Sequence, residues 1–213
     1  MLQFSKRLAS KGLRVTLLTT TSISESVQAI SSHSVNIETI SDCSAENNTF
    51  DNTDSDQFES FKMTVTQSLT KFIETQNSSQ HPPKFLIYDA VMPWALDIAR
   101  QLGLDGAPFF TQSGSVNAIY YHAHRGAIKF PLGVPTASLP SMPPLGINDL
   151  PSFMANTGSY PALYSILLNQ FSNIDEPNWI FYNTFYNLEH EVSKESNTYG
   201  NTANTYIWYT LHL

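Results

Sequence analysis

The chain has 213 residues, 41% of them hydrophobic and 14% charged, and its 11 Lys+Arg against 18 Asp+Glu give a formal net charge of -7. A chain of this length buries about 70% of its unfolded surface, so it needs neither a metal nor a disulfide to hold a core. The acidic balance excludes a nucleic-acid partner of the usual basic kind, and the single cysteine, Cys43, excludes an intramolecular disulfide and favours the cytoplasm.

The first 83 residues predict an alternation of helices and strands. The expected elements are a helix over 1–9, a strand over 13–20, a helix from Ser22 or Ser24 to Ile30, a strand over 35–40 and a helix over 58–73. Gly12 supplies a left-handed stop for the first helix. A helix that precedes the first strand normally crosses over from an earlier parallel strand, so we expect the first strand of the sheet to be missing. The polar segment Ser41 to Gln57 is either a functional loop or a linker.

The next 40 residues predict two parallel strands, each followed by a helix. Lys84 to Tyr88 is a compact apolar strand that ends at Asp89, and Ala107 to Thr111 is the next strand. Ligands of open α/β sheets bind outside the carboxyl ends of the strands. The positions to examine first are therefore Asp89, Thr111, Gln112 and Ser113.

The rest of the chain is less regular. Residues 130–153 hold too many prolines for a helix or a central strand, so they predict a surface path that is either a linker or a wall of the site. A helix over 160–171 and a strand over 178–185 follow. The Asn- and Thr-rich start of the sequence after Ser193 suggests disorder. The aromatic end at 206–213 has no physical explanation.

Several chemical signatures are missing from the sequence. It contains no GxGxxG after a strand, no GxxxxGK[ST], no GxSxG and no HExxH. The main signatures of dinucleotide enzymes, P-loop NTPases, ordinary α/β-hydrolases and zinc proteases are therefore absent. Asp89 is the best candidate for chemistry. It either caps the following helix or orients a histidine general base, and none of the six histidines is placed convincingly to be that base.

Four stretches of the sequence carry a family resemblance. They are MLQFSKRLASKGLRVTLLTT, FLIYDAVMPWALDIARQLGLDGAPFFTQSGSVNAIYYH, LPSMPPLGINDLPSF and NWIFYNTFYNLEHEV. Together they resemble the N-terminal half of a plant family-1 UDP-glycosyltransferase, closest to the group that glucosylates small carboxylic acids and phenols. The resemblance covers residues 1–192, and YDxxxPWALDIA and PFFTQ are its most specific blocks.

The resemblance implies a fold and a reaction. The fold is α/β, the Rossmann-like parallel sheet with flanking helices of the N-terminal domain of a GT-B glycosyltransferase, which binds the acceptor while a C-terminal domain binds the UDP-sugar. A histidine removes the acceptor proton, the acceptor oxygen attacks the anomeric carbon, and UDP leaves with inversion and without a metal. By position, Asp89 matches the aspartate that orients the histidine, and Thr111 matches a contact to the donor sugar. Trp94, Phe110, Gln112 and Ser113 are possible residues of the acceptor cleft.

Two departures from the family pattern limit this expectation. The family's histidine lies in a Gly-His-x-x-Pro turn, which the sequence does not contain, and its donor-binding signature is also not found. We therefore expect residues 1–192 to be a partial acceptor domain, 193–213 to be a divergent tail, and the chain, truncated at both ends, to be inactive alone. The alternatives are a non-catalytic module that binds small molecules or partners, and a fragment from an incorrectly assembled gene. The expected partner is a small-molecule acceptor, with UDP-glucose as co-substrate, for a monomer that does not insert into membranes.

Overall fold

The computed structural model contains two compact units, Met1–Pro83 and Lys84–Leu213. The structure describes residues 1–30, 35–42, 55–130, 132–133, 135–155, 161–184, 187–199 and 205–208.

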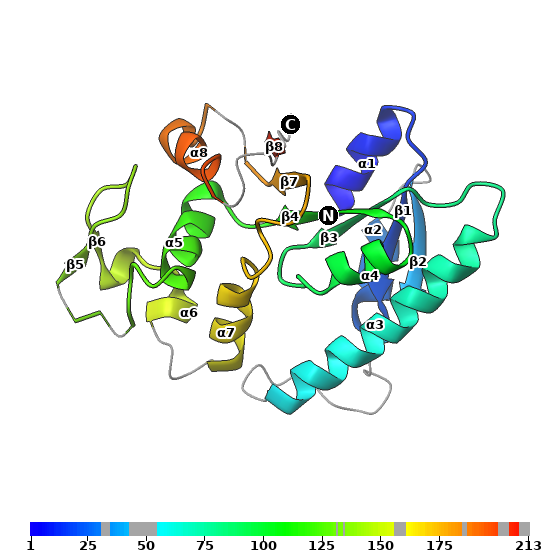
Figure 1. Cartoon of the computed structure of the whole chain (residues 1–213), viewed down its shortest axis with the longest axis horizontal. Coiled ribbons are helices and arrows are strands. Elements are labelled where there is room, and N and C mark those ends of the chain that lie inside the picture. The colour runs from blue at the N-terminus through cyan, green and yellow to red at the C-terminus, as the bar shows by residue number, and fades with distance from the viewer. Residues whose placement is uncertain are drawn as a thin grey trace. The chain divides into compact units, whose positions relative to one another are not determined.

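The first unit alternates helices and strands, as the sequence predicts. Its elements are α1 (Leu2–Ser10), β1 (Thr16–Thr20), the 3-10 turn η1 (Thr21–Ile23), α2 (Ser24–Ile30), β2 (Asn36–Ile40) and α3 (Ser55–Asn77). Strands β1 and β2 are parallel, with Thr16 opposite Asn36 and Thr20 opposite Ile40 (Figure 1). Gly12 follows α1 with φ +84°, so the predicted left-handed stop is confirmed.

The packing of this unit follows from residue spacing. Helix α3 buries Val65, Leu69 and Ile73, which are four residues apart and therefore lie on one face. Strand β1 is shorter than predicted, because Leu13 is exposed and the ladder begins only at Thr16. Residues 43–54, which form most of the predicted polar loop, lie outside the described residues.

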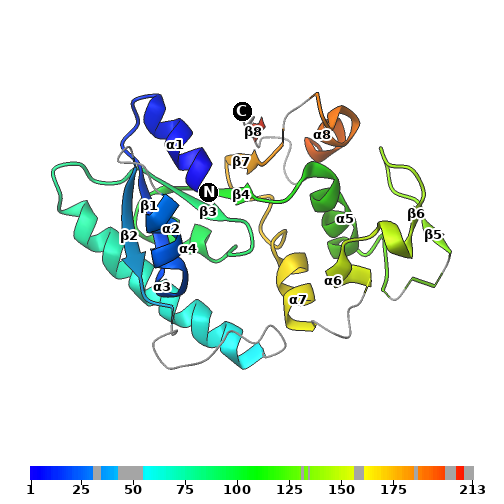
Figure 2. The same cartoon turned by 180° about the vertical axis from the view of Figure 1, so that it is seen from behind.

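The second unit is built around a parallel sheet in the order β3-β4-β7-β8 (Figure 1). Its main elements are β3 (Phe85–Asp89), α4 (Ala95–Gln101), β4 (Asp105–Phe110), α5 (Gly114–His124), α7 (Pro161–Asn169), β7 (Trp179–Tyr182), α8 (His190–Ser196) and β8 (Thr205–Trp208). Helix α5 packs against α7 and α8, and the views from opposite sides agree on this arrangement (Figure 2). The parallel sheets with flanking helices confirm the predicted Rossmann-like α/β class.

The core of this unit lies between the sheet and α5 to α7. The ring of Phe110 is 0% exposed and stacks on Phe171 and Tyr182, at centroid distances of 5.1 Å and 4.9 Å. Met154, Leu167 and other apolar side chains from the helices complete the same cluster. A close-packed aromatic layer in the core therefore supports the end of β4.

The proline-rich segment forms only short elements. Strands β5 (Thr136–Ala137) and β6 (Leu145–Gly146) make an antiparallel pair, followed by the 3-10 turn η3 (Ile147–Asp149) and α6 (Ser152–Ala155). This agrees with the prediction that no long helix or central strand forms there. Residues 131 and 134 lie outside the described residues.

The structure orders part of the C-terminal sequence that composition assigned to disorder. Helix α8 crosses residue 192 and packs against α5, with Ser193, Ser196 and the following Tyr199 buried, so the expectation of disorder is wrong for residues 193–199. Polar composition misleads here because small hydroxyl side chains occupy the buried side of a helix. Strand β8 then adds to the sheet beside β7. Residues 200–204 and 209–213 lie outside the described residues.

Candidate functional site

The carboxyl ends of β3 and β4 form one edge of the sheet of the second unit. Asp89 is the last residue of β3 and pairs in register with Phe109 of β4, so Thr111 follows β4 at the same edge. The amide of Ala90 donates a hydrogen bond of 3.1 Å to the carbonyl of Phe109, which keeps the two strands joined to their ends. The two residues with the strongest predicted roles are thus brought to one edge.

Asp89 does not cap a helix. Helix α4 begins at Ala95, with Trp94 at its N-cap position, whereas the Oδ1 atom of Asp89 accepts a hydrogen bond of 3.2 Å from the amide of Val91. Burial raises the pKa of Asp89 above its usual value, and this single hydrogen bond offsets the effect only in part. A cationic partner would stabilise such a carboxylate. In the described part of the chain, no Lys, Arg or His side chain forms an ion pair with it.

The side chains around the loop after β4 differ in exposure and in contacts. Thr111 and Gln112 are partly exposed, and Ser113 is exposed and caps α5 by accepting a hydrogen bond of 3.4 Å from the amide of Val116. Phe110 points into the core instead, so it supports the loop and does not line a cleft. Within the residues that the structure describes, the side chains of Thr111 and Gln112 make no hydrogen bond and remain available to a ligand.

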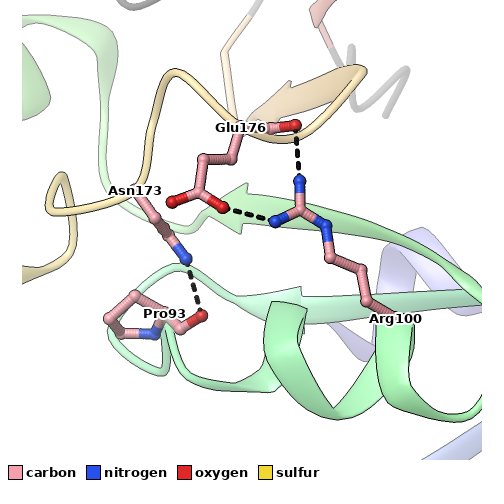
Figure 3. Close-up of polar contacts among 4 residues, drawn as sticks. All are labelled: Pro93, Arg100, Asn173 and Glu176. Atoms are coloured by element: carbon pink, nitrogen blue, oxygen red, sulfur yellow. Dashed lines mark hydrogen bonds and ion pairs between the residues drawn. The ribbon is translucent and has the colours of Figure 1, made fainter.

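The turn between Asp89 and Trp94 is tied to the segment after α7. The side-chain amide of Asn173 donates a hydrogen bond of 2.9 Å to the carbonyl of Pro93 (Figure 3). The guanidinium of Arg100 in α4 binds Glu176 twice, through the carboxylate and, at 2.9 Å, through the backbone carbonyl. Trp94 is partly buried beside this link. These contacts join the β3–α4 turn and helix α4 to the crossover that leads to β7.

Glu189 is a residue of this edge that the sequence analysis missed. Its carboxylate accepts hydrogen bonds from the amides of Gly114 (2.7 Å) and Ser115 (2.8 Å), from the Ser115 hydroxyl (2.6 Å) and from the Thr184 hydroxyl (2.5 Å). Burial opposes ionisation, but the hydrogen bonds from Ser115, Thr184 and Gly114 outweigh it and lower the pKa of Glu189. The negative charge also faces the positive end of the α5 dipole.

Asn183 also belongs to this edge and was missed. Its side-chain amide donates a hydrogen bond of 2.8 Å to the carbonyl of Thr111, and its backbone amide donates one of 2.9 Å to Phe110. A signal for it existed in the sequence. Asn183 directly follows the strand β7, so the strand-end rule that selected Asp89 and Thr111 applies to it equally.

A hollow of about 350 Å³ lies beside the start of α5. Helix α5 contributes Ser115, Val116 and Ile119 to its lining, and the opposite wall comes from the proline-rich segment. The residues of that wall are Met142, Pro143, Leu145, Asp149, Leu150 and Pro151. The segment that the sequence left open as linker or wall therefore walls a mostly apolar hollow.

The structure offers no sign of a metal centre or a membrane span in the residues it describes. No group of three or more His, Cys, Asp or Glu side chains is arranged to hold an ion there. Across the same residues, no helix is both long enough and apolar enough to cross a bilayer. His122, one of the two neighbouring histidines of α5, contacts Glu195 at 2.7 Å.

Comparisons with known proteins decide the family. No protein-family profile matches the chain. Mogroside I-E synthase of Siraitia grosvenorii is 42% identical over 207 residues, which are 96% of this chain and 45% of that protein. UDP-glucosyltransferase 74AE2 of Panax ginseng is 41% identical over 202 residues, which are 91% of this chain and 43% of that protein. The chain is a homologue of part of the plant UDP-glycosyltransferases.

Solved structures of plant UDP-glycosyltransferases share the fold. Os79 from O. sativa, crystallised with UDP and deoxynivalenol-3-glucoside, superposes with a TM-score of 0.81 at 25% identity, over 98% of this chain and 49% of that one. The chain thus spans about half the length of the UDP-glycosyltransferases that it matches. The family predicted from the quoted sequence blocks is confirmed, and so is the GT-B type of fold.

Proposed function

We propose that the chain provides the acceptor-binding half of an inverting UDP-sugar-dependent glycosyltransferase. The donor is UDP-glucose, and the acceptor is a small metabolite that carries a hydroxyl or carboxyl group. The observation that carries this proposal is the shared edge of β3 and β4, where the buried carboxylate of Asp89 and the exposed loop of Thr111 lie together in a chain of this family. Residues 1–192 are a partial acceptor domain and 193–213 a tail whose sequence diverges from the family, in a monomeric cytoplasmic protein.

Each residue at this edge has a role in the proposed reaction. Asp89 orients a histidine base and stabilises the imidazolium that forms when the acceptor proton is removed. Its raised pKa fits this role, because a buried carboxylate with few hydrogen bonds gains most from a cationic neighbour. Thr111 contacts the donor sugar, and Trp94, Gln112 and Ser113 border the acceptor. The acceptor lies in the hollow between Val116 and the proline-rich wall.

The catalytic part of the proposal is tested in a chimera. Residues 1–192 replace the matched region of the Siraitia synthase, and the synthase supplies everything outside that region, including the histidine and the donor-binding half. We expect the chimera to transfer glucose from UDP-glucose to the synthase's acceptors or to small phenols. In the chimera, Asp89→Asn should lower kcat by about 10²- to 10⁴-fold, because the histidine loses its orienting charge.

A matched control separates this role from a loss of surface charge. Asp97→Asn removes one carboxylate from the exposed side of α4 and should leave kcat unchanged. Equal turnover of the Asp89→Asn and Asp97→Asn chimeras would contradict the role of Asp89. The 213-residue chain without added segments should give no product from UDP-glucose and a phenolic acceptor, and measurable turnover would contradict the proposed division of labour.

The binding part of the proposal is tested on the chain itself, with 4-hydroxybenzoate as the probe because it carries both a phenol and a carboxylate. Equilibrium dialysis should show saturable binding that Val116→Trp abolishes by filling the hollow. Thr136→Trp is the matched control, because it lines a second hollow of about 350 Å³ at a different place in the same unit. Binding without turnover by an active-site-complete chimera would favour the alternative function, a non-catalytic binding module.

A further inference from the structure

The loop between β4 and the start of α5 is held by Asn183 and Glu189, which lie more than 70 residues away, and by the nearby Asn117. The backbone carbonyl of Thr111 accepts from Asn183, and the carbonyl of Gln112 accepts a hydrogen bond of 3.1 Å from the side chain of Asn117. The amides of Gly114 and Ser115 both donate to Glu189. The carbonyl of Ser113 accepts from the amide of Asn117 at 3.0 Å. Each residue from Thr111 to Ser115 thus takes part in a backbone hydrogen bond to a side chain or within the helix.

These contacts hold the backbone and leave the ligand-facing groups free. The side chains of Thr111 and Gln112 take no part in them, whereas the hydroxyl of Ser115, which lines the hollow, is held at 2.6 Å from the Glu189 carboxylate. Glu189 also fills the space in front of Gly114, where a Cβ atom would lie 2.9 Å from its Oε2 atom. The carboxylate therefore fixes both the start of α5 and the orientation of a hydroxyl in the hollow.

We propose that Glu189 and Asn183 are positioning residues for ligand binding at the strand-end loop, an inference that rests on the proposed function. Glu189 sets the position of Ser115 toward the acceptor, and Asn183 sets the position of Thr111. Both residues lie just after β7, so this strand supplies the supports of the site while β3 and β4 supply the residues that meet the ligands. Neither residue touches the reacting atoms.

The chemistry of Glu189 makes the proposal specific. An ionised carboxylate only accepts hydrogen bonds, and all four groups that face it are donors. Glutamine at this position has one oxygen and one amide nitrogen, so either Gly114 or Ser115 then faces a donor. The loop must shift to relieve that contact, even though glutamine keeps the size of the side chain.

The experiment measures binding of 4-hydroxybenzoate to the full 213-residue chain by equilibrium dialysis, for the unaltered chain and four variants. Glu189→Gln and Asn183→Asp should weaken binding by about tenfold or more, the effect of losing or reversing a charge-assisted or buried hydrogen bond. Thr184→Ser keeps the hydroxyl that donates to Glu189 and should leave affinity within about twofold. Glu191→Gln is the charge-matched control and should bind normally. The Glu191 side chain lies in the first turn of α8 and is 69% exposed.

Two further readings separate positioning from simple loss of structure. Affinities are compared under conditions in which tryptophan fluorescence shows each variant to be folded, and hydrogen exchange is measured at the amides of Gly114 and Ser115. Glu189→Gln should raise exchange at these amides, and Thr184→Ser, which keeps its hydrogen bond to Glu189, should not. Normal binding by folded Glu189→Gln, or equal weakening by Thr184→Ser, overturns this inference alone. Absence of binding by the unaltered chain overturns the proposed acceptor site and this inference with it.

Discussion

Phe110 gives the sharpest test of how the candidate site is supported, because its side chain lies in the core directly under the strand-end loop. Its ring stacks on Phe171 at 5.1 Å and on Tyr182 at 4.9 Å, and it is 0% exposed. Phe110→Leu keeps most of the apolar volume and removes both ring pairs. Each pair contributes about 0.5–1.5 kcal/mol beyond the area it buries, so the free energy of unfolding should fall by about 1–3 kcal/mol.

Urea unfolding followed by tryptophan fluorescence measures the stability of the second unit, which contains Phe110. All three tryptophans, Trp94, Trp179 and Trp208, lie within Lys84–Leu213, so their emission reports on the second unit alone. With a denaturant slope of about 2 kcal/mol per M, the midpoint should fall by about 1 M while the slope stays the same.

Phe130→Leu is the matched control for this prediction. Phe130 is partly exposed and forms one ring pair with Tyr164 at the longer distance of 6.2 Å, so its substitution should cost about 1 kcal/mol or less. A midpoint for Phe110→Leu that equals that of the unaltered chain, or a larger effect of Phe130→Leu, would refute the reasoning that the aromatic layer supports the end of β4.

Three further predictions concern packing and charge. Gly106→Ala should lower stability by about 1–3 kcal/mol in thermal unfolding, because its Cβ atom would lie 2.6 Å from Cδ1 of the buried Leu96 and 3.3 Å from Cβ of Ala99; a neutral effect would contradict this. Glu189→Gln should flatten the acid side of the stability profile. The folded pKa of Glu189 is lowered, so its contribution is present above the ordinary value of 4.5 and is lost as pH falls through the folded pKa, and parallel profiles in urea titrations at successive pH values would argue against this. Arg100→Met should cost only about 1 kcal/mol, since both partners of its ion pair are nearly half exposed; a double-mutant cycle with Glu176→Gln measures the coupling, and a coupling well above that size would show the link in Figure 3 to be a major support.

The sequence predicted the parts of the site that depend on local pattern. The apolar run of β3 ends at Asp89 in both prediction and structure, and Thr111 follows β4, because short buried strands are marked by residue type and by their polar ends. The boundaries of β1 and β4 shifted by one to three residues, because exposure and ladder pairing decide their ends.

The local sequence pattern could not predict the residues that support the site. Glu189 lies at the start of a polar stretch, where an acidic residue is typical of a solvated helix end, and its partners Gly114 and Ser115 are 75 and 74 residues away. The parallel pairing of β4 with β7 and the packing of α8 against α5 bring the two segments together. The same holds for Ser193 and Ser196, whose burial depends on the packing of α8 against α5.

The long separation between the strand-end loop and its supports has a consequence for the order in which the site forms during synthesis. The loop at Thr111 leaves the ribosome well before Asn183 and Glu189, and closing so large a segment must precede the contacts that reward it. A nascent chain that has reached only α7 therefore holds its ligand-facing residues on an unsupported loop. The site becomes competent late, when β7 enters the sheet beside β4, and ligand capture by stalled nascent chains should begin only after residue 189 has emerged.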